Sequence, residues 1–151
     1  MLKLHQKAPS FLLLDQDGNT HTLEQYLGKK VLIYFYPKDD TPGCTTEACN
    51  FRDNYEALKN AGLVVLGVSK DTTKSHKLFA EKFNLPFPLL SDEDTSVCQA
   101  YGVWGMKKFM GREYMGITRS SFLIDEKGLL SKIYEDVQPK EHTQEVAKDI
   151  I

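Results

Sequence analysis

Two cysteines five residues apart, Cys44 and Cys49, are the residues of this sequence best placed to do chemistry. Cys44 follows the polar stretch Lys38-Asp39-Asp40-Thr41-Pro42-Gly43, in which Thr-Pro predicts the first turn of a helix with Thr41 as its cap. A thiolate at a helix N-terminus is stabilised by the unpaired N–H groups and by the helix dipole. We therefore expect Cys44 to be a nucleophilic thiol.

Ionisation alone does not make Cys44 a fast nucleophile. A free thiol with a pKa of ~8.5 is only a few per cent ionised at pH 7, so complete ionisation increases the reactive fraction about 30-fold, or roughly 2 kcal/mol. Faster chemistry needs hydrogen-bond donors aimed at the charge that develops in the transition state. The hydroxyl of Thr41 and the backbone N–H groups of Gly43 and Cys44 are the nearest candidates.

The spacing between Cys44 and Cys49 bears on whether they pair. Five residues of an ideal α-helix separate the two Cα atoms by about 8.7 Å, whereas a disulfide rarely joins Cα atoms more than about 7 Å apart. We therefore expect no static disulfide. If the two cysteines react together, the first turns of the helix must unwind.

The third cysteine and the histidines carry no comparable signal. Cys98 is expected to be an inert residue on a short helix, and gaps of four and 48 residues between the cysteines are not typical of zinc ligands. We interpret Asp39-Asp40 as a solvated loop rather than a metal site. All four histidines are expected on the surface: His5, His21, His76 and His142.

The elements that would position Cys44 alternate between strands and helices. Residues 31–36 are apolar without alternation and predict a strand buried on both faces, and residues 63–69 predict a second. Helices are predicted over residues 44–59, 72–84, 95–101 and 140–151. Cys44 would then lie at the carboxyl end of a central strand, where ligands bind in open α/β sheets.

The remaining segments complete an α/β fold. A hairpin is predicted over residues 11–22, one helical turn over 22–27, an edge strand over 85–90, a loop or irregular strand over 102–116, and a second hairpin over 120–134. This order predicts a mixed central β-sheet flanked by helices on both faces, with an N-terminal β-hairpin. The thioredoxin-like fold has this layout.

Composition limits the classes of function. A chain of 151 residues, 41% hydrophobic and 26% charged, is typical of one globular domain spanning residues 1–151. The net charge of -2 argues against a nucleic-acid partner. No apolar run approaches the roughly 20 residues of a membrane span, and the first residues lack the pattern of a secretory signal. A cytoplasmic location is therefore expected.

The segment from Tyr36 to Cys49, YPKDDTPGCTTEAC, resembles the active-site signature of the peroxiredoxins. The resemblance is closest to the bacterioferritin comigratory protein, or Q-type, subfamily. It extends through residues 50–53 and reappears in residues 102–105 and 114–125, so it covers nearly the whole chain.

The resemblance implies a role for five residues. Cys44 matches the peroxidatic cysteine, and Thr41 matches the hydroxyl that orients the peroxide. Pro37 matches the proline that shields the thiolate, and Arg119 matches the active-site arginine, whose guanidinium favours the thiolate and donates to the peroxide. Cys49 matches the resolving cysteine of those members that have one five residues further on.

The implied activity is thiol-dependent reduction of hydrogen peroxide and organic hydroperoxides to water and alcohols. Cys44 would become a sulfenic acid and then form an intramolecular disulfide with Cys49, which thioredoxin, or sometimes glutaredoxin, reduces. The resemblance implies no metal, haem or flavin, and favours a monomer or weak dimer. Cys98 has no counterpart in the signature, and we expect it neither to resolve the sulfenic acid nor to bridge two chains.

Two other functions are compatible with a reactive cysteine. A thiol–disulfide oxidoreductase of the thioredoxin type would carry Cys-x-x-Cys, whereas four residues separate Cys44 from Cys49. A redox sensor or chaperone would use the same oxidation to change its contacts, and the sequence leaves that open as an added role.

Overall fold

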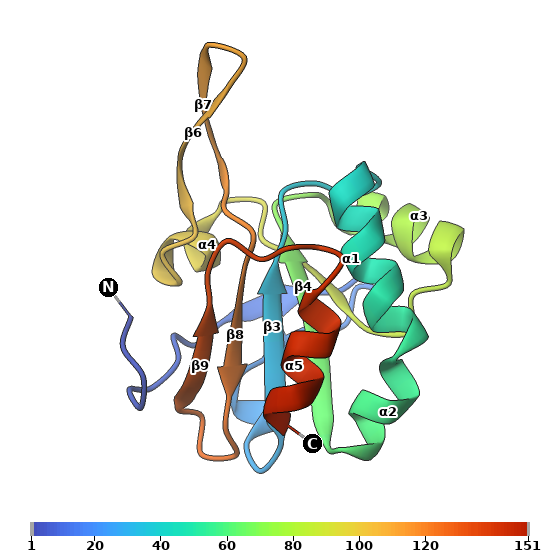
Figure 1. The fold of residues 1–151 in the computed structure, drawn as a ribbon, viewed down its shortest axis with the longest axis vertical. Helices are drawn as coiled ribbons and strands as arrows, with labels where there is room; N and C mark the ends of the chain where they lie inside the picture. The colour runs from blue at the N-terminus through green and yellow to red at the C-terminus, as the bar shows by residue number, and fades with distance from the viewer. Residues whose placement is uncertain (1, 151) are drawn as a thin grey trace.

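A seven-stranded mixed sheet forms the centre of the computed structural model, which describes residues 2–150 (Figure 1). The strands are β1 (Leu12–Leu14), β2 (Thr20–Thr22), β3 (Lys30–Phe35), β4 (Leu63–Ser69), β5 (Leu89–Ser91), β8 (Ser120–Ile124) and β9 (Leu130–Tyr134). Their order across the sheet is β2-β1-β5-β4-β3-β8-β9. The mixed sheet and the N-terminal hairpin β1–β2 are as predicted, and the fold is thioredoxin-like.

The central strand β3 is internal to the sheet, and it is buried on both faces because each face carries a hydrophobic core. It pairs in parallel with β4 and antiparallel with β8. Val31, Ile33 and Phe35 pack into one hydrophobic core, whereas Leu32 and Tyr34 pack into the other. This arrangement explains why the apolar run of β3 shows no alternation.

The helices cover both faces of the sheet. They are the 3-10 helix η1 (Glu24–Tyr26), α1 (Pro42–Asp53), α2 (Tyr55–Asn60), α3 (Thr73–Phe83), α4 (Ser96–Ala100) and α5 (His142–Ile150). Residues of α1, α3 and α5 line one core, and residues of α4 line the other. Within residues 2–150, no helix combines the length and the hydropathy that a membrane crossing needs.

The helix predicted over residues 44–59 is two helices. It begins at Pro42, as the Thr41-Pro42 signal predicted, and is interrupted at Asn54, which has φ −109° and ψ 8°. The Asn54 side chain donates to the carbonyl of Asn50 over 2.8 Å. The backbone N–H of Asn54 donates to the same carbonyl, so the side chain and the backbone share this acceptor where α1 ends.

The strand predicted at the sheet edge over residues 85–90 is displaced and internal. The observed strand β5 begins after Pro86 and Pro88 and lies between β4 and β1. The prediction of an edge strand was wrong because β1, from a distant part of the chain, pairs with its other side through Leu14 and Ser91.

Residues 102–116 are more regular than predicted. They form most of a hairpin of β6 (Trp104–Phe109) and β7 (Arg112–Ile117), which projects from the end of the molecule where β3 ends (Figure 1). Its turn residues Met110 and Gly111 have φ values of 50° and 79°. Met-Gly is a weak turn signal compared with Asn-Gly or Asp-Gly, so the sequence pattern did not reveal the hairpin.

Three of the four histidines are buried, so the prediction that all lie on the surface was wrong for them. His21 lies 2.7 Å from Asp15 and 2.6 Å from the Tyr26 hydroxyl. His142 lies 2.7 Å from the Ser121 hydroxyl. His76 is described below, and only His5 is exposed. Buried imidazoles are tolerated because each has hydrogen-bond partners, nearby in the chain for His21 and from other segments for His76 and His142.

Candidate active site

The Cys44 thiol lies in the first turn of α1, at the carboxyl end of β3. Only 1% of the residue is exposed, and it packs in the same core as Tyr34 and Phe51. Pro42 and Gly43 precede it in the helix. The local signals that predicted a helix start at Thr41-Pro42 therefore place the cysteine as expected, near the junction of β3 and α1.

Backbone donors surround this end of the helix. The amide of Thr45 donates to the carbonyl of Thr41 over 2.8 Å and closes the first helical turn. The earlier N–H groups of Gly43 and Cys44 have no acceptor within α1, because the first N–H groups of a helix never do. They are the donors that a developing negative charge would meet beside Cys44.

Arg119 reaches Cys44 across the sheet. In the antiparallel pairing of β3 with β8, Phe35 is opposite Ser120, so Arg119 lies just beyond the carboxyl end of β3. Its Nη2 lies 3.3 Å from the Cys44 sulfur. Its carbonyl accepts from the amide of Val137 over 3.0 Å, which holds the backbone in place. A guanidinium at this distance stabilises a thiolate.

Gly43 leaves the space that this contact requires. A Cβ atom at position 43 would lie 3.0 Å from Arg119 Nη2 and 3.6 Å from Cγ of Pro139. A larger residue would therefore push the guanidinium away from the sulfur. The glycine serves the close approach of Arg119 in addition to supplying a backbone N–H.

Glu47 is a site residue that the sequence reasoning missed. It is fully buried, one helical turn after Cys44, and its Oε1 accepts from Arg119 Nη1 over 2.8 Å. Burial raises the pKa of Glu47 from 4.5 to about 7, although the charge and hydrogen bond of Arg119 act in the opposite direction. Its Oε2 has no hydrogen-bond partner within the described residues. The i, i+3 spacing from Cys44 was the available signal.

Arg119 remains a cation in this environment. Burial of the guanidinium opposes its charge, but Glu47 and Cys44 outweigh burial and raise the pKa of Arg119 above its ordinary value. Lys107 of the hairpin is a second cation close enough for Arg119 to affect it. Burial and then the charge of Arg119 lower the pKa of Lys107. Arg119 therefore keeps its positive charge beside the Cys44 sulfur.

The raised pKa of Glu47 predicts a pH-dependent effect on stability. A carboxyl group whose pKa is raised by folding favours the folded state most below its unfolded pKa of 4.5, and this stabilisation is lost as the pH rises through about 7. The unchanged protein therefore loses this stabilisation between pH 5 and 8, whereas Glu47→Gln has no such carboxyl group to lose it from. We expect the free energy of unfolding of Glu47→Gln, relative to that of the unchanged protein, to rise by up to roughly 3 kcal/mol over this range. Urea unfolding of both proteins at several pH values measures this difference.

Other titrating groups cancel in that comparison because both proteins share them. A matched control is Glu56→Gln, which removes an exposed carboxyl group from α2. Its stability relative to the unchanged protein should vary little with pH. A flat difference for Glu47→Gln as well would show that the pKa of Glu47 is not raised.

Thr41 occupies the cap position but does not cap the helix with its side chain. Its backbone is extended, with φ −107° and ψ 156°, and the hydroxyl makes no cap hydrogen bond. Instead the hydroxyl donates to the carbonyl of Lys38 over 2.8 Å. Because its one proton is used there, the hydroxyl is not the free donor expected beside Cys44, and its oxygen keeps lone pairs that can accept a hydrogen bond. Pro37, in the same loop, is half-buried.

Cys49 lies on the same unbroken helix as Cys44. It is half-buried, and all three cysteines are free thiols. The neighbouring Asn50 side chain donates to the carbonyl of Pro139 over 3.1 Å and so ties this part of α1 to the segment before α5. The helical geometry keeps the two sulfurs apart, as the spacing predicted, and pairing requires the start of α1 to unwind.

Cys98 lies in a different part of the molecule. It is fully buried on α4, in the core on the opposite face of the sheet from Cys44. Burial, together with the nearby Asp92 carboxylate, raises the pKa of the Cys98 thiol well above its ordinary value. These surroundings are those of an inert structural thiol.

Comparison with known proteins gives one consistent result. Residues 4–133 match the AhpC/TSA family. The chain is 52% identical over 145 residues to a putative peroxiredoxin bcp of Coxiella burnetii, covering 96% of each protein. It is 47% identical over 149 residues to peroxiredoxin Bcp of Bacillus subtilis, covering 99% of this chain and 95% of the relative. Among solved structures, it superposes with a TM-score of 0.88 on the bacterioferritin comigratory protein of Xanthomonas campestris, whose structure was determined to study its alkyl peroxide reduction activity. The two chains are 37% identical, and the match covers 93% of this chain and 89% of the other.

Proposed function

Because the chain belongs to the AhpC/TSA family and is a thiol-dependent peroxidase, we propose that Cys44 is the residue that attacks the peroxide. The observation that carries this proposal is the 3.3 Å contact between Arg119 Nη2 and the Cys44 sulfur. This contact places a buried sulfur, a permanent cation and two free backbone N–H groups at one point. The other cysteines have no such combination of donors.

The proposed reaction begins with an electron pair of the Cys44 thiolate. It forms an S–O bond with one peroxide oxygen while the O–O bond breaks, and the second oxygen leaves as hydroxide or alkoxide. That oxygen takes up a proton to give water or an alcohol, and Cys44 is left as a sulfenic acid. Arg119 and the N–H groups of Gly43 and Cys44 donate to the oxygens as negative charge develops. Thr41 accepts from the peroxide O–H.

Pro37 is the remaining residue of the proposed site. We propose that its ring excludes water from the thiolate and so strengthens the hydrogen bonds to the reacting atoms. Its half-buried position two residues after the end of β3 suits this role.

The sulfenic acid is proposed to be resolved by Cys49. The Cys49 thiolate attacks the Cys44 sulfur, an S–S bond forms, and the sulfenic oxygen leaves as water after gaining a proton. The start of α1 unwinds so that the two sulfurs meet. Cys98 is the remaining cysteine, and its position behind the sheet supports the choice of Cys49.

Substitution of Cys49 tests this assignment. We expect reduced Cys49→Ser to consume one equivalent of peroxide, at a rate within about two-fold of the unchanged protein, because Cys44 and its donors are intact. No intrachain disulfide should form. Stopped-flow mixing measures the rate, and intact mass under non-reducing conditions detects the disulfide as a loss of two hydrogen atoms. An intrachain disulfide in Cys49→Ser would assign resolution to Cys98 instead.

We further propose that the disulfide is reduced by thioredoxin, as the dithiol partner, with glutaredoxin as the alternative. Peroxide-dependent oxidation of NADPH, measured separately with a thioredoxin system and a glutathione–glutaredoxin system, distinguishes the two. The reaction is complete with thiols alone, so the proposal includes no metal, haem or flavin. It treats residues 1–151 as one domain that acts as a monomer or weak dimer in the cytoplasm and binds no nucleic acid, consistent with the net charge of -2.

A further inference from the structure

A buried carboxylate lies in the loop that leads into the candidate active site. Asp39 is 7% exposed, although its neighbours Lys38 and Asp40 are exposed. This finding corrects the prediction of a solvated Asp39-Asp40 loop. Charged side chains are rarely buried unless they are paired and hydrogen-bonded. The partners of Asp39 therefore matter for how the loop is held.

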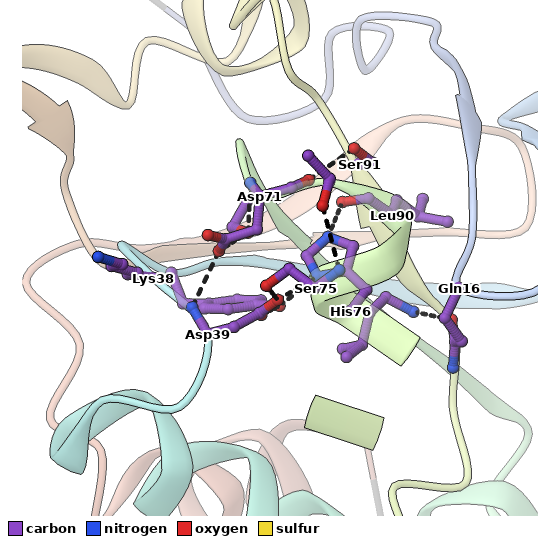
Figure 2. Close-up of polar contacts among 12 residues, drawn as sticks. Gln16, Lys38, Asp39, Asp71, Ser75, His76, Leu90 and Ser91 are labelled. Carbon is purple, nitrogen blue, oxygen red and sulfur yellow. Dashed lines mark hydrogen bonds and ion pairs between the residues drawn. The ribbon is translucent and has the colours of Figure 1, made fainter. Parts of the chain in front are cut away.

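Asp39 is held through both its side chain and its backbone (Figure 2). Its Oδ1 accepts from the Tyr36 hydroxyl over 2.6 Å. Its Oδ2 accepts from Ser75 Oγ over 2.8 Å and lies 2.7 Å from His76 Nδ1. Its backbone N–H donates to Asp71 Oδ2 over 2.9 Å. The loop after β3 is thus tied to α3 and to the loop after β4.

His76 faces Asp39 with one ring nitrogen and a backbone carbonyl with the other. The imidazole is fully buried, and its Nε2 lies 3.0 Å from the carbonyl of Leu90. A carbonyl only accepts, so the hydrogen bond at this side is donated by Nε2. On the other side, Nδ1 lies 2.7 Å from the Asp39 carboxylate. Both ring nitrogens therefore have a partner, which makes the burial of the ring tolerable.

The same residues have ligand atoms suited to a metal ion. One atom each of Asp39, Asp71 and His76 lies within 4.8 Å of the others. However, both oxygens of Asp39 and both nitrogens of His76 already have protein partners. A cation would have to displace these hydrogen bonds, so the arrangement suits a structural clamp better than a metal site.

Asp39, which these hydrogen bonds hold, lies one residue before the bend at Asp40 that leads into Thr41. Asp40 has a left-handed backbone with φ 56°, and Thr41 and α1 follow directly. Aspartate is one of the few residues that tolerate this conformation, and the chain turns sharply there. The position of Thr41 therefore depends on where Asp39 is anchored.

We propose that Asp39 and His76 are positioning residues of the peroxidase, which clamp the loop that carries Pro37 and Thr41. The clamp rests on the roles proposed above for Cys44 and Thr41. The clamp holds the loop against α3 while the start of α1 unwinds after each oxidation. The start of α1 then re-forms in the same position. Arg119, which approaches from β8, is independent of it.

This division of labour predicts unequal effects on two reactions of Cys44. Alkylation by iodoacetamide needs an accessible thiolate, which Arg119 stabilises, but it makes no use of Thr41. Oxidation by hydrogen peroxide needs the thiolate and also the Thr41 oxygen that orients the peroxide. Loss of the clamp should slow peroxide oxidation much more than alkylation.

The test compares Asp39→Ala with Asp39→Asn and with Asp40→Asn. In Asp39→Asn the amide oxygen accepts from Tyr36 and the amide N–H donates to a neutral Nδ1 of His76, so the clamp is preserved. Asp40→Asn makes the same change of charge at the exposed neighbour, with a residue that also tolerates positive φ. Both rates are measured on reduced protein, well below the melting temperature of each variant.

We expect Asp39→Ala to lose at least ten-fold in the rate of peroxide oxidation and less than three-fold in the rate of alkylation. Asp39→Asn and Asp40→Asn should stay within about three-fold of the unchanged protein in both rates. His76→Phe, which fills much of the same space but has no N–H to donate to Asp39, provides the same test should Asp39→Ala fail to fold.

Three results would overturn the clamp: equal losses of both rates in Asp39→Ala, no loss of either rate, or Asp39→Asn as slow in peroxide oxidation as Asp39→Ala. Failure of the proposed function looks different. In that case the unchanged protein itself would show no oxidation of Cys44 by peroxide, whatever stands at position 39.

Discussion

Cys44→Ser is expected to lose peroxide reduction, with a rate lower by on the order of 10⁴-fold or more. A serine hydroxyl stays protonated at pH 7, and Arg119 and the helix N-terminus favour an anion but accept no proton. The shape of the site is otherwise kept, because serine differs by one atom. The measurement is peroxide-dependent oxidation of NADPH coupled through thioredoxin and thioredoxin reductase.

Cys98→Ala is the matched control for this prediction. It removes a thiol that is fully buried on the opposite side of the sheet, and alanine introduces no unpartnered hydroxyl there. Peroxidase activity should remain within about two-fold, with at most a moderate loss of stability from the cavity. Full turnover by Cys44→Ser would exclude Cys44 as the nucleophile, and loss of activity in Cys98→Ala alone would point to Cys98.

Arg119→Met should have the second largest effect, a 10²- to 10³-fold slower oxidation of Cys44 by peroxide, or about 3–4 kcal/mol. Methionine keeps an unbranched chain but removes both the charge and the donor that lies 3.3 Å from the sulfur. Stopped-flow oxidation of the reduced protein measures the change directly.

Loss of Arg119 also leaves the buried Glu47 without its partner, so stability and catalysis must be separated. The double variant Arg119→Met, Glu47→Gln removes the unpaired carboxyl group and should recover stability in urea unfolding. Its oxidation rate should stay low, because the donor to the peroxide is still missing. Arg112→Met, at an exposed position of the hairpin, is the control and should be unaffected. Equal losses in Arg112→Met and Arg119→Met would contradict a specific role of Arg119.

Features that depend on neighbouring residues were predictable from the sequence. The unalternating run of β3 indicated a central strand, and Thr41-Pro42 indicated where α1 begins. The cysteine at that start and the four-residue gap to Cys49 indicated a reactive thiol and a helix that must unwind before a disulfide forms. Each of these signals lies within about a dozen residues, which is the range over which backbone propensity and helical spacing act.

Features that depend on distant partners were predicted less well. The burial of Asp39 and His76 is possible because Tyr36, Ser75 and the Leu90 carbonyl meet them, and no local pattern reports that meeting. Likewise, β5 is an internal strand because β1, from a distant part of the chain, pairs with its other edge. Polar residues are surface residues by default, and only the assembled fold shows which of them have buried partners.

The sequence by itself determined the chemistry of this protein: a cysteine at the end of a central strand and the start of a helix, within a signature of the peroxidases to which it belongs. Residue types and spacing did not single out a cation for that cysteine; the resemblance pointed to Arg119, and the tertiary structure shows the contact. Arg119 is 75 residues away in the chain, and the antiparallel register of β8 with β3 brings it to the sulfur. Register is set by side chains packing across a whole sheet, so no single segment of the sequence encodes it.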